Sequence, residues 1–357
     1  MEEAERRPEN LLRRGTEYQR WQKAEGIPIH SGAYVTDLYH ADVAPWARIG
    51  QKGAFVNLAD QEIDDAWLIE LAPGGDTNPL RHMFEATIVV LDGRGATTIW
   101  QPGKQKQTVE WARGSVFAPP INCFYQHFNL DGQRPARLLA VTLAPMVINF
   151  FRSAEMPFNV DYVFADRYDG EGDYFNGTGE RDETRAREWV TNFVPDIRSF
   201  PLDSNDDRGV GSFRLGFTFS KNQMVAHSSA WPVGTYLKGH RHGVGAHVLI
   251  LEGSGYSLLW FEGEERQKVD WQDGSVLSPR DHEFHQHFNP GPAPVRYLAF
   301  RLGAADVKRY TSAGVILDQY DSEDEDPAIY DLFERECARN GVKPAFPRPN
   351  YRARAQV

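Results

Sequence analysis

The stretch KGHRHGVGAHVLILEGSG, residues 238–255, places three histidines within eight residues and follows them with an apolar run and a Gly-x-Gly turn. A β-strand sends alternate side chains to opposite faces, so His240 and His242 are expected to share one face. His285 and His287 repeat this spacing further along the chain. If the two segments are neighbouring barrel strands, three or four imidazoles converge, and imidazole suits Fe, Zn, Cu and Ni. The pattern predicts a metal site, although a bare His-x-His also fits buried, hydrogen-bonded histidines.

The same stretch belongs to a motif that the chain contains twice. Residues 74–129 and 234–289 align without a gap at an offset of 160, and 21 of the 56 positions are identical. The shared residues include glycines, two tryptophans and a closing QHFN. Self-similarity of this extent indicates gene duplication, so we expect two copies of one fold.

Both copies have the pattern of short strands. Residues 86–100 and 246–260 are apolar segments, each interrupted by a Gly-x-Gly turn, and further strands follow after Gly and Pro. Many short strands separated in this way favour an all-β sandwich or barrel. Helices are expected in only three places: residues 5–26, 180–196 and 326–341, the last ending at a glycine typical of a C-cap.

Composition excludes several classes of function. The formal net charge is −11, which argues against nucleic acid as a partner. Two cysteines far apart make neither a disulfide framework nor a thiolate zinc site. The N-terminus does not resemble a secretory signal, and no run approaches the roughly 18 apolar residues of a membrane helix. We therefore expect a cytoplasmic protein without a membrane or nucleic-acid partner.

The spacing of the motif resembles the cupin pattern, G-x5-H-x-H followed by a Gly, and then Gly, Pro, His and Asn. The matching residues are Gly234, His240, His242, Gly253, Gly274, Pro279, His285 and Asn289. The resemblance implies two tandem cupin barrels (double-stranded β-helix, or jelly-roll) with a few peripheral helices. It divides the chain into a helical or extended segment (1–50), an N-terminal cupin (51–147), a connection (148–209), a C-terminal cupin (210–305), and a helix and tail (306–357).

Two departures from the cupin pattern concern the metal ligands. The usual glutamate position is Ala246, and the segment from Pro279 to His285 has one extra residue and lacks a glycine. His247 lies one position past Ala246, so strand alternation turns it to the opposite face and we do not expect it to bind the metal. The predicted ligand set is therefore three histidines, His240, His242 and His285.

Residues 240–255, together with FHQH at residues 284–287, are similar to gentisate 1,2-dioxygenase and its salicylate and hydroxynaphthoate relatives. Those bicupins also have alanine in place of the glutamate, and WHDH where this chain has FHQH. The resemblance implies an Fe(II)-dependent dioxygenase that uses O2 to cleave a small anionic aromatic or enolisable substrate. Mn, Ni and Zn are the alternative metals. In that family the metal lies in the N-terminal cupin, whereas here it is expected in the C-terminal one.

The first copy has lost the ligand pattern. Leu80 stands where the second copy has His240, and Tyr125 stands where it has His285. Only His82 and His127 are retained, while Glu85 is out of register. Leucine cannot bind a metal, so we expect no metal in this copy. Packing, an oligomer contact or a lid over the second barrel are the expected roles.

Several residues could handle an anionic substrate near the metal. Lys238 is expected on the face of the histidine pair, Arg301 lies on the closing strand of the same copy, and Arg280 follows the motif proline. His287 is predicted to point inward and to contact the substrate or a metal ligand. Trp231, Trp260 and Phe284 are candidates for the apolar lining. Each also has a simpler interpretation, as a surface charge or as part of the core.

Two other functions remain open. A three-histidine site without redox chemistry could serve a lyase, isomerase or hydrolase, and a cupin could also bind a small molecule without being an enzyme. Cupin barrels often pack against a neighbour, so the resemblance implies a homodimer or a larger even homo-oligomer. Aromatic residues, at 12% of the chain, fit such an interface.

Overall fold

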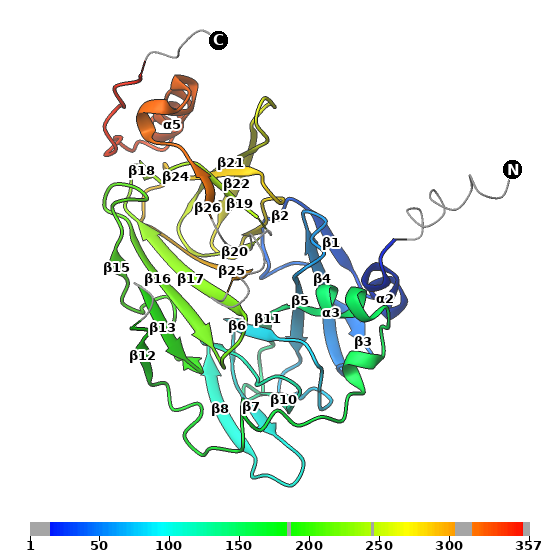
Figure 1. The fold of residues 1–357 in the computed structure, drawn as a ribbon. Helices are drawn as coiled ribbons and strands as arrows, with labels where there is room; N and C mark the ends of the chain where they lie inside the picture. Colours follow the sequence, from blue (N-terminus) through cyan, green and yellow to red (C-terminus); the bar gives the residue numbers. More distant parts are fainter. Residues whose placement is uncertain (1–14, 184–186, 244–245, 304–315, 353–357) are drawn as a thin grey trace, which may run out of the picture.

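Two β-barrels follow one another along the chain. The computed structural model describes residues 15–183, 187–243, 246–303 and 316–352 (Figure 1). Each copy of the repeated motif lies in one barrel, the first shown in blue to cyan and the second in green to yellow. The prediction of an all-β fold with two barrels and few helices is confirmed.

The first barrel consists of a larger sheet, in the order β1-β4-β5-β11-β6-β9-β14 with β3 paired to β4, and a smaller sheet, β10-β7-β8. The strands are β1 (Ile29–Gly32), β3 (Ala44–Trp46), β4 (Gln51–Leu58), β5 (Asp65–Leu71), β6 (Ala86–Asp92), β7 (Arg94–Trp100), β8 (Gln107–Ala112), β9 (Val116–Phe117), β10 (Phe124–Asn129), β11 (Ala136–Thr142) and β14 (Phe193–Val194).

The second barrel repeats this plan with the sheets β12-β13-β16-β17-β25-β20-β23-β2 and β22-β21-β24-β19-β26, to which β15 and β18 add through β16 and β24. The strands are β2 (Tyr34–Val35), β12 (Gly179–Arg181), β13 (Glu188–Thr191), β15 (Asp203–Ser204), β16 (Phe213–Phe219), β17 (Met224–Trp231), β18 (Thr235–Tyr236), β19 (His240–His242), β20 (His247–Glu252), β21 (Ser254–Trp260), β22 (Gln267–Gln272), β23 (Val276–Leu277), β24 (Phe284–Asn289), β25 (Val295–Leu302) and β26 (Ile316–Gln319).

A glycine at the start of one strand lets a tryptophan pack closely in each barrel. A Cβ on Gly95 would lie 2.2 Å from the Trp111 ring, and one on Gly255 would lie 2.5 Å from the Trp271 ring. Only glycine allows this approach, which explains why each copy contains one such Gly–Trp pair.

The larger sheets of the two barrels pack against each other around one shared core. This core joins first-barrel residues such as Leu68 and Leu139 to Phe217, Leu298 and Phe300 of the second barrel. Because side chains alternate along a strand, the opposite faces of β16, β17 and β25 are turned toward the interior of the second barrel. That interior is where the metal motif lies.

The two copies exchange short strands. β2 comes from the start of the first copy but pairs with β23 of the second barrel, and β14 precedes the second copy but pairs with β9 of the first barrel. The exchange is reciprocal in detail: the Leu38 N–H donates to the Gly274 carbonyl, and the Ile197 N–H donates to the Gly114 carbonyl. Each barrel therefore depends on a segment that belongs in sequence to the other copy.

Two of the three expected helical regions are helical. α2 (Glu17–Glu25) lies within residues 5–26 and begins with a capping box formed by Thr16 and Gln19. α5 (Pro327–Arg339) lies within residues 326–341 and is capped by the Asp326 side chain. Residues 1–14 lie outside the described part. The structure adds α3 (Ala144–Phe151) and the short 3-10 turns η1 (Met156–Phe158) and η2 (Ser322–Asp324).

The prediction of a helix over residues 180–196 was wrong. The described part of this segment contains β12, β13 and β14 instead. β13 pairs in parallel with β16 through Glu188–Thr191, and β14 pairs with β9. Trp189, Val190 and Thr191 are residue types that favour strands, and pairing with a neighbouring sheet outweighs the helix propensity of the charged residues before them.

A buried polar cluster connects α2 and the two barrels. His247 of β20 lies 3.3 Å from Asp64 through Nδ1 and Oδ2, and the exposure of both side chains is 0%. Asp65 accepts hydrogen bonds from the Tyr18 hydroxyl and, at 2.8 Å, from Gln22 Nε2 of α2. Burial raises the pKa of Asp65 to about 7, while Asp64 and Asp65 raise the pKa of His247 although burial opposes this.

Candidate metal centre

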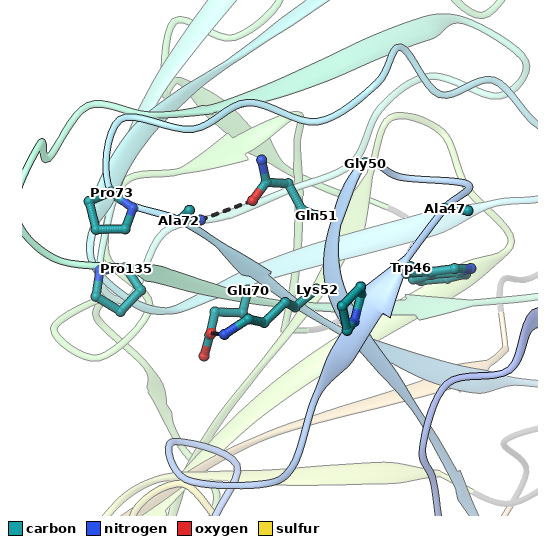
Figure 2. Close-up of a pocket in the computed structure, with 10 residues that line it drawn as sticks. Trp46, Ala47, Gly50, Gln51, Lys52, Glu70, Ala72, Pro73 and Pro135 are labelled. Carbon is teal, nitrogen blue, oxygen red and sulfur yellow. Dashed lines mark hydrogen bonds and ion pairs between the residues drawn. The ribbon is translucent and has the colours of Figure 1, made fainter.

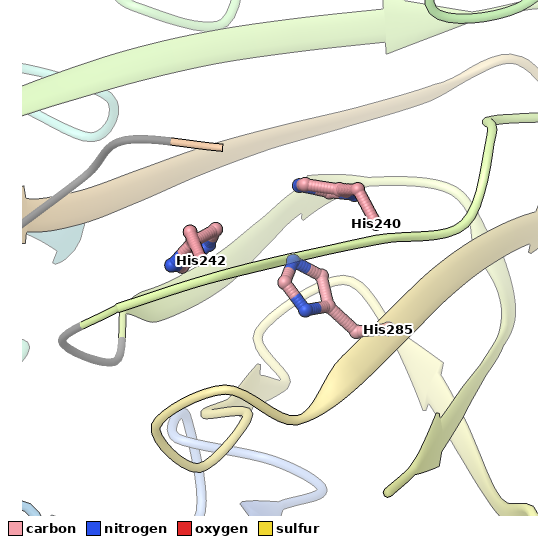
Figure 3. Close-up of side chains that lie close together, drawn as sticks. All are labelled: His240, His242 and His285. Atoms are coloured by element: carbon pink, nitrogen blue, oxygen red, sulfur yellow. The ribbon is translucent and has the colours of Figure 1, made fainter. Parts of the chain in front are cut away.

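Three histidines on two paired strands face one another inside the second barrel. His240 of β19 is directly opposite His285 of β24, and His242 lies two residues further along β19 (Figure 3). The ring centroids of His240 and His285 are 4.1 Å apart, and those of His242 and His285 are 4.9 Å apart. One nitrogen from each ring lies within 4.8 Å of the others. The predicted convergence of these three residues is therefore present in the structure.

The environment keeps two of these imidazoles neutral. Burial lowers the pKa of His240 and of His285 well below the usual value, and Arg208 and the neighbouring histidines lower both pKa values further. A neutral imidazole presents a lone pair to a metal, whereas a protonated one cannot. In the part of the chain that the structure describes, this is the one group of three or more such residues able to hold a metal ion. The donor set fits a divalent metal held by three nitrogen ligands.

No carboxylate completes the site in the usual cupin position. Ala246 packs in the apolar core of the barrel. His247, one residue on, points to the opposite face and contacts Asp64 of the first barrel. Strand alternation places these residues as expected.

Arg208 lies against one of the candidate ligands. Its Nη2 is 2.9 Å from Nδ1 and 3.1 Å from Nε2 of His240, and its Nη1 donates to Gln319. Burial lowers the pKa of Arg208 to about 10, so the guanidinium is still charged at neutral pH. The Arg208 guanidinium donates to the lone pair of His240 that a metal would need. It therefore competes with a metal for His240, unless a bound anion pairs with Arg208 and moves the guanidinium away.

His287 is held by a hydrogen-bonded chain rather than placed freely in the cavity. The Trp271 indole N–H donates to Ser257 Oγ at 2.9 Å, and Ser257 Oγ lies 2.7 Å from His287 Nδ1. The indole can only donate, so it fills one lone pair of the serine oxygen; a serine hydroxyl that donates to Nδ1 in turn places the His287 proton on Nε2. Burial lowers the pKa of His287 to about 3. The His287 ring is thus neutral at neutral pH.

The first barrel contains the same chain of contacts. Trp111 Nε1 donates to Thr97 Oγ1 at 2.9 Å, and Thr97 Oγ1 lies 2.7 Å from His127 Nδ1. These three residues occupy the positions of Trp271, Ser257 and His287 at the 160-residue offset. This chain of contacts is present in the first barrel, which lacks the three histidine ligands. It therefore belongs to the scaffold that both barrels share.

We predict that Ser257→Ala will leave metal binding intact but change the tautomer of His287. Without the hydroxyl, Nδ1 loses its donor at a cost of about 1 kcal/mol, and the proton is no longer confined to Nε2. ¹⁵N NMR of the histidine rings will report this change. Thr97→Val is the matched variant in the first barrel and should affect only His127. An Nδ1-protonated His287 in the unaltered protein would contradict the assignment.

The first barrel replaces the ligand cluster with packed side chains. Leu80 and Tyr125 form the bridge that corresponds to His240 and His285. His82 Nε2 is 2.7 Å from the Tyr125 hydroxyl, and its Nδ1 is 2.8 Å from the Phe84 carbonyl, so both ring nitrogens have partners. His82 also stacks on Phe84 with centroids 3.9 Å apart. No metal-binding group was found among the described residues of this barrel.

The buried histidines should make the protein sensitive to acid. Burial lowers the pKa of His82 to about 4 and that of His127 to about 3, against about 6.5 in an unfolded chain. A depressed pKa stabilises the fold above pH 6.5, and this stability is lost as the pH falls toward 4. For each such histidine the free energy of unfolding should fall by about 1.4 kcal/mol per pH unit in this window.

Urea unfolding of chelator-treated protein between pH 7 and 4 measures this dependence. His127→Gln should reduce the slope, because glutamine does not titrate. The control is His40→Gln, whose side chain is 84% exposed. Equal slopes in the two variants would refute the prediction.

The structure gives the other predicted residues different surroundings. Lys238 Nζ donates to Asp321 at 3.0 Å and is partly exposed, and Arg280 pairs with Glu283. Arg301 is on the inner face of β25, as its register with Val225 shows. Trp231 packs near His287, with centroids 6.3 Å apart.

Trp260 and Phe284 line the other side of their sheet. Their rings stack with centroids 5.4 Å apart, within the apolar cluster that includes α5. Phe284 precedes His285 on β24, so alternation turns it away from the histidine cluster. These two residues are core, not lining.

Three residues at the site were missed from the sequence: Arg208, Arg214 and His227. Arg214 and His227 lie on β16 and β17, before the gapless repeat begins at Gly234. An alignment extended backward would have shown His227 opposite Trp67 of the first copy, a change from apolar to polar. Arg208 lies in a loop, and no local pattern indicates that such a side chain reaches His240.

A separate pocket of about 620 Å³ opens on the surface of the first barrel beside β3 and β4 (Figure 2). Its polar groups are paired with one another: Lys52 with Glu70 at 3.1 Å, and Gln51 with the Ala72 N–H at 3.0 Å. It offers no set of convergent unpaired groups, so the histidine cluster is the stronger candidate site.

Several solved structures of oxalate decarboxylase have a similar fold. Three of them match this chain with a TM-score of 0.51 and 12% sequence identity, and the match covers 76% of this chain and 77–78% of theirs. Two of the three are from Bacillus subtilis, and one of these two concerns the Mn(II) centres of the enzyme. No family model and no curated protein sequence matches. Across the described residues, no helix is long and apolar enough to span a membrane. The chain has the bicupin fold.

Proposed function

We propose that this bicupin is an enzyme that uses one divalent metal ion in its second barrel to act on a small carboxylate substrate. The observation that carries the proposal is the set of three converging histidines, with neutral His240 and His285, beside arginines in the same barrel that include Arg301, whose Nε is fully buried. Neutral ligands do not offset the charge of the metal, and the arginines add further positive charge. An anion is the ligand that such an interior favours.

The chain's own residues have distinct tasks in this proposal. His240, His242 and His285 hold the metal, which supplies Lewis acidity and, if it is iron, redox chemistry. With its proton on Nε2, His287 can donate a hydrogen bond to a substrate, and its low pKa excludes it as a base at neutral pH. Trp231 and Tyr297 pack beside His287 and exclude water from that wall.

The finer proposal is an Fe(II)-dependent dioxygenase that consumes O2 and cleaves an aromatic or enolisable acid. Support comes from the three-histidine set without a carboxylate and from the resemblance of residues 240–255 to gentisate 1,2-dioxygenase. The second candidate is a non-redox lyase such as a decarboxylase. It is favoured by the likeness in fold to oxalate decarboxylase.

Oxygen uptake separates the two candidates. For the dioxygenase we expect O2 consumption in step with loss of a hydroxylated aromatic acid or diketone, loss of activity after chelation, and recovery with Fe(II) far better than with Zn(II). The same panel should include oxalate and related acids, with CO2 release measured under nitrogen. Turnover without oxygen, or equal recovery with Zn(II), would reject the dioxygenase in favour of the lyase.

A further inference from the structure

Three neighbouring strands of the second barrel turn polar residues toward its interior. Across β16, β17 and β25, Arg214 is opposite Ser229, His227 is opposite Gly216 and Ala299, and Arg301 is opposite Val225. Directly paired residues share a face of the sheet. Arg214 and Arg301 therefore lie diagonally on either side of His227, on the face that also holds Tyr297, which packs near His287.

The two arginines have no anionic partner in direct contact. Within the described residues, neither Arg214 nor Arg301 makes a hydrogen bond or ion pair, and Arg301 Nε is fully buried without an acceptor. Arg208 adds a third cation beside His240. Burial, together with the neighbouring Arg214 and Arg208, lowers the pKa of Arg301 to about 10, so the side chain is still charged at neutral pH.

One carboxylate lies near this group. Glu188 of β13 is next to Gly216 and accepts a hydrogen bond from Thr218 Oγ1 at 2.8 Å. One negative charge does not balance three guanidinium groups. All three arginines are only partly exposed, and a charge withdrawn from water without a partner is costly, so their positions require an explanation beyond the fold.

The first barrel shows that the fold does not need cations here. By the same register, Gly53 corresponds to Arg214, Trp67 to His227 and Thr142 to Arg301. Trp46, Phe55 and Trp67 fill that space with ring centroids 5.2–6.3 Å apart. The barrel without a ligand set is closed by aromatic rings, and the barrel with one has unpaired arginines.

We propose that Arg214 and Arg301 form a second anion subsite, so that the substrate is a dicarboxylate with one carboxylate at the histidine cluster and the other between these arginines. The inference rests on the proposed function for its first carboxylate, while the arginine subsite stands on the geometry of the barrel wall alone. Guanidinium groups bind carboxylates through paired, charge-assisted hydrogen bonds. Arg208, which contacts His240 and interacts electrostatically with Arg214 and Arg301, is the cation that a bound dicarboxylate would draw from His240.

Calorimetric titration of Zn(II)-loaded protein tests the proposal with oxalate, malonate, succinate and glutarate, each against the monocarboxylate of equal chain length. We expect at least one diacid to bind ten times more tightly or better than its monoacid, since each tenfold corresponds to about 1.4 kcal/mol. Arg214→Gln and Arg301→Gln should remove this preference while zinc content remains near one. The control is Arg241→Gln, because Arg241 is on the other face of β19 and pairs with Asp318. Equal affinities throughout the series would overturn the subsite.

A second measurement separates the subsite from the metal site. In chelator-treated protein, the preferred diacid should still raise the melting temperature, and Arg301→Gln should abolish that shift. In the absence of any anion, Arg301→Gln should itself raise the melting temperature by about 2–4 °C, because it removes a partly buried charge whose Nε has no acceptor. If no metal binds but the anion shift persists, the proposed function fails and the subsite stands. If metal binds and no anion shift is seen, the subsite fails.

Discussion

His240→Ala and His285→Ala will reduce the metal content of the chain from about one equivalent to near zero. Each variant removes one of three ligands from a site where no fourth protein ligand was found in the described residues. Loss of a residue that merely orients a ligand costs roughly 10–100-fold in metal affinity, and loss of a ligand should cost more. Elemental analysis after anaerobic purification and dialysis measures the effect. His242→Ala should behave in the same way.

The first barrel supplies matched controls for this experiment. His82→Ala removes the residue that corresponds to His242, and His127→Ala removes the one that corresponds to His287. Both should keep one equivalent, because Leu80 and Tyr125 leave that barrel without a ligand set. Two equivalents in the unaltered protein, or loss of metal in His82→Ala, would show that the first barrel binds metal after all.

His247→Ala will destabilise the protein by about 3–5 kcal/mol without changing its metal content. The variant leaves the Asp64 charge buried between the barrels without its imidazole partner, and breaking a buried pair from one side has a cost of this size. Replacing both His247 and Asp64 with leucine should recover most of the loss, because no uncompensated charge remains. The midpoint of urea unfolding gives the stability, and elemental analysis gives the metal.

The pH dependence of this pair has a definite sign. The folded protein raises the pKa of His247 above its unfolded value of about 6.5, so the proton is bound more tightly in the folded state. The stabilisation is complete below pH 6.5 and is lost as the pH rises through the folded pKa. Above neutral pH, the unaltered protein should therefore lose stability relative to the variant in which His247 and Asp64 are both replaced by leucine. Loss of metal in His247→Ala would show instead that this residue is a ligand.

The sequence predicted the metal cluster because its ligands obey local rules. Alternation along a strand placed His240 and His242 on one face and turned His247 away, and the repeat showed which ligands the first copy lacks. Trp260 and Phe284 were weaker candidates, and the same alternation, applied to Phe284 beside His285, would have excluded that ring from the lining.

The remaining features depend on pairing between distant segments. β2 and β14 are two residues long, and no local pattern reveals which sheet such a segment joins. Residues 180–196 resemble a helix in composition, but the described part pairs with β16 and β9 and forms strands. Arg214 and Arg301 lie far apart in sequence, and only the register of β16, β17 and β25 brings them to one wall.

The reciprocal pairing of β2 with β23 and of β14 with β9 makes the chain behave as two fused subunits of a swapped dimer. Neither half can be cut out at the repeat boundary without removing an edge strand from one sheet and leaving an orphan strand on the other. Expression of the second half alone would leave the β23 edge open to pairing between chains, so we expect it to aggregate. Before the duplication, a single barrel would have completed its sheet with the edge strand of a second molecule. Tandem fusion then placed both barrels and both exchanged strands in one chain.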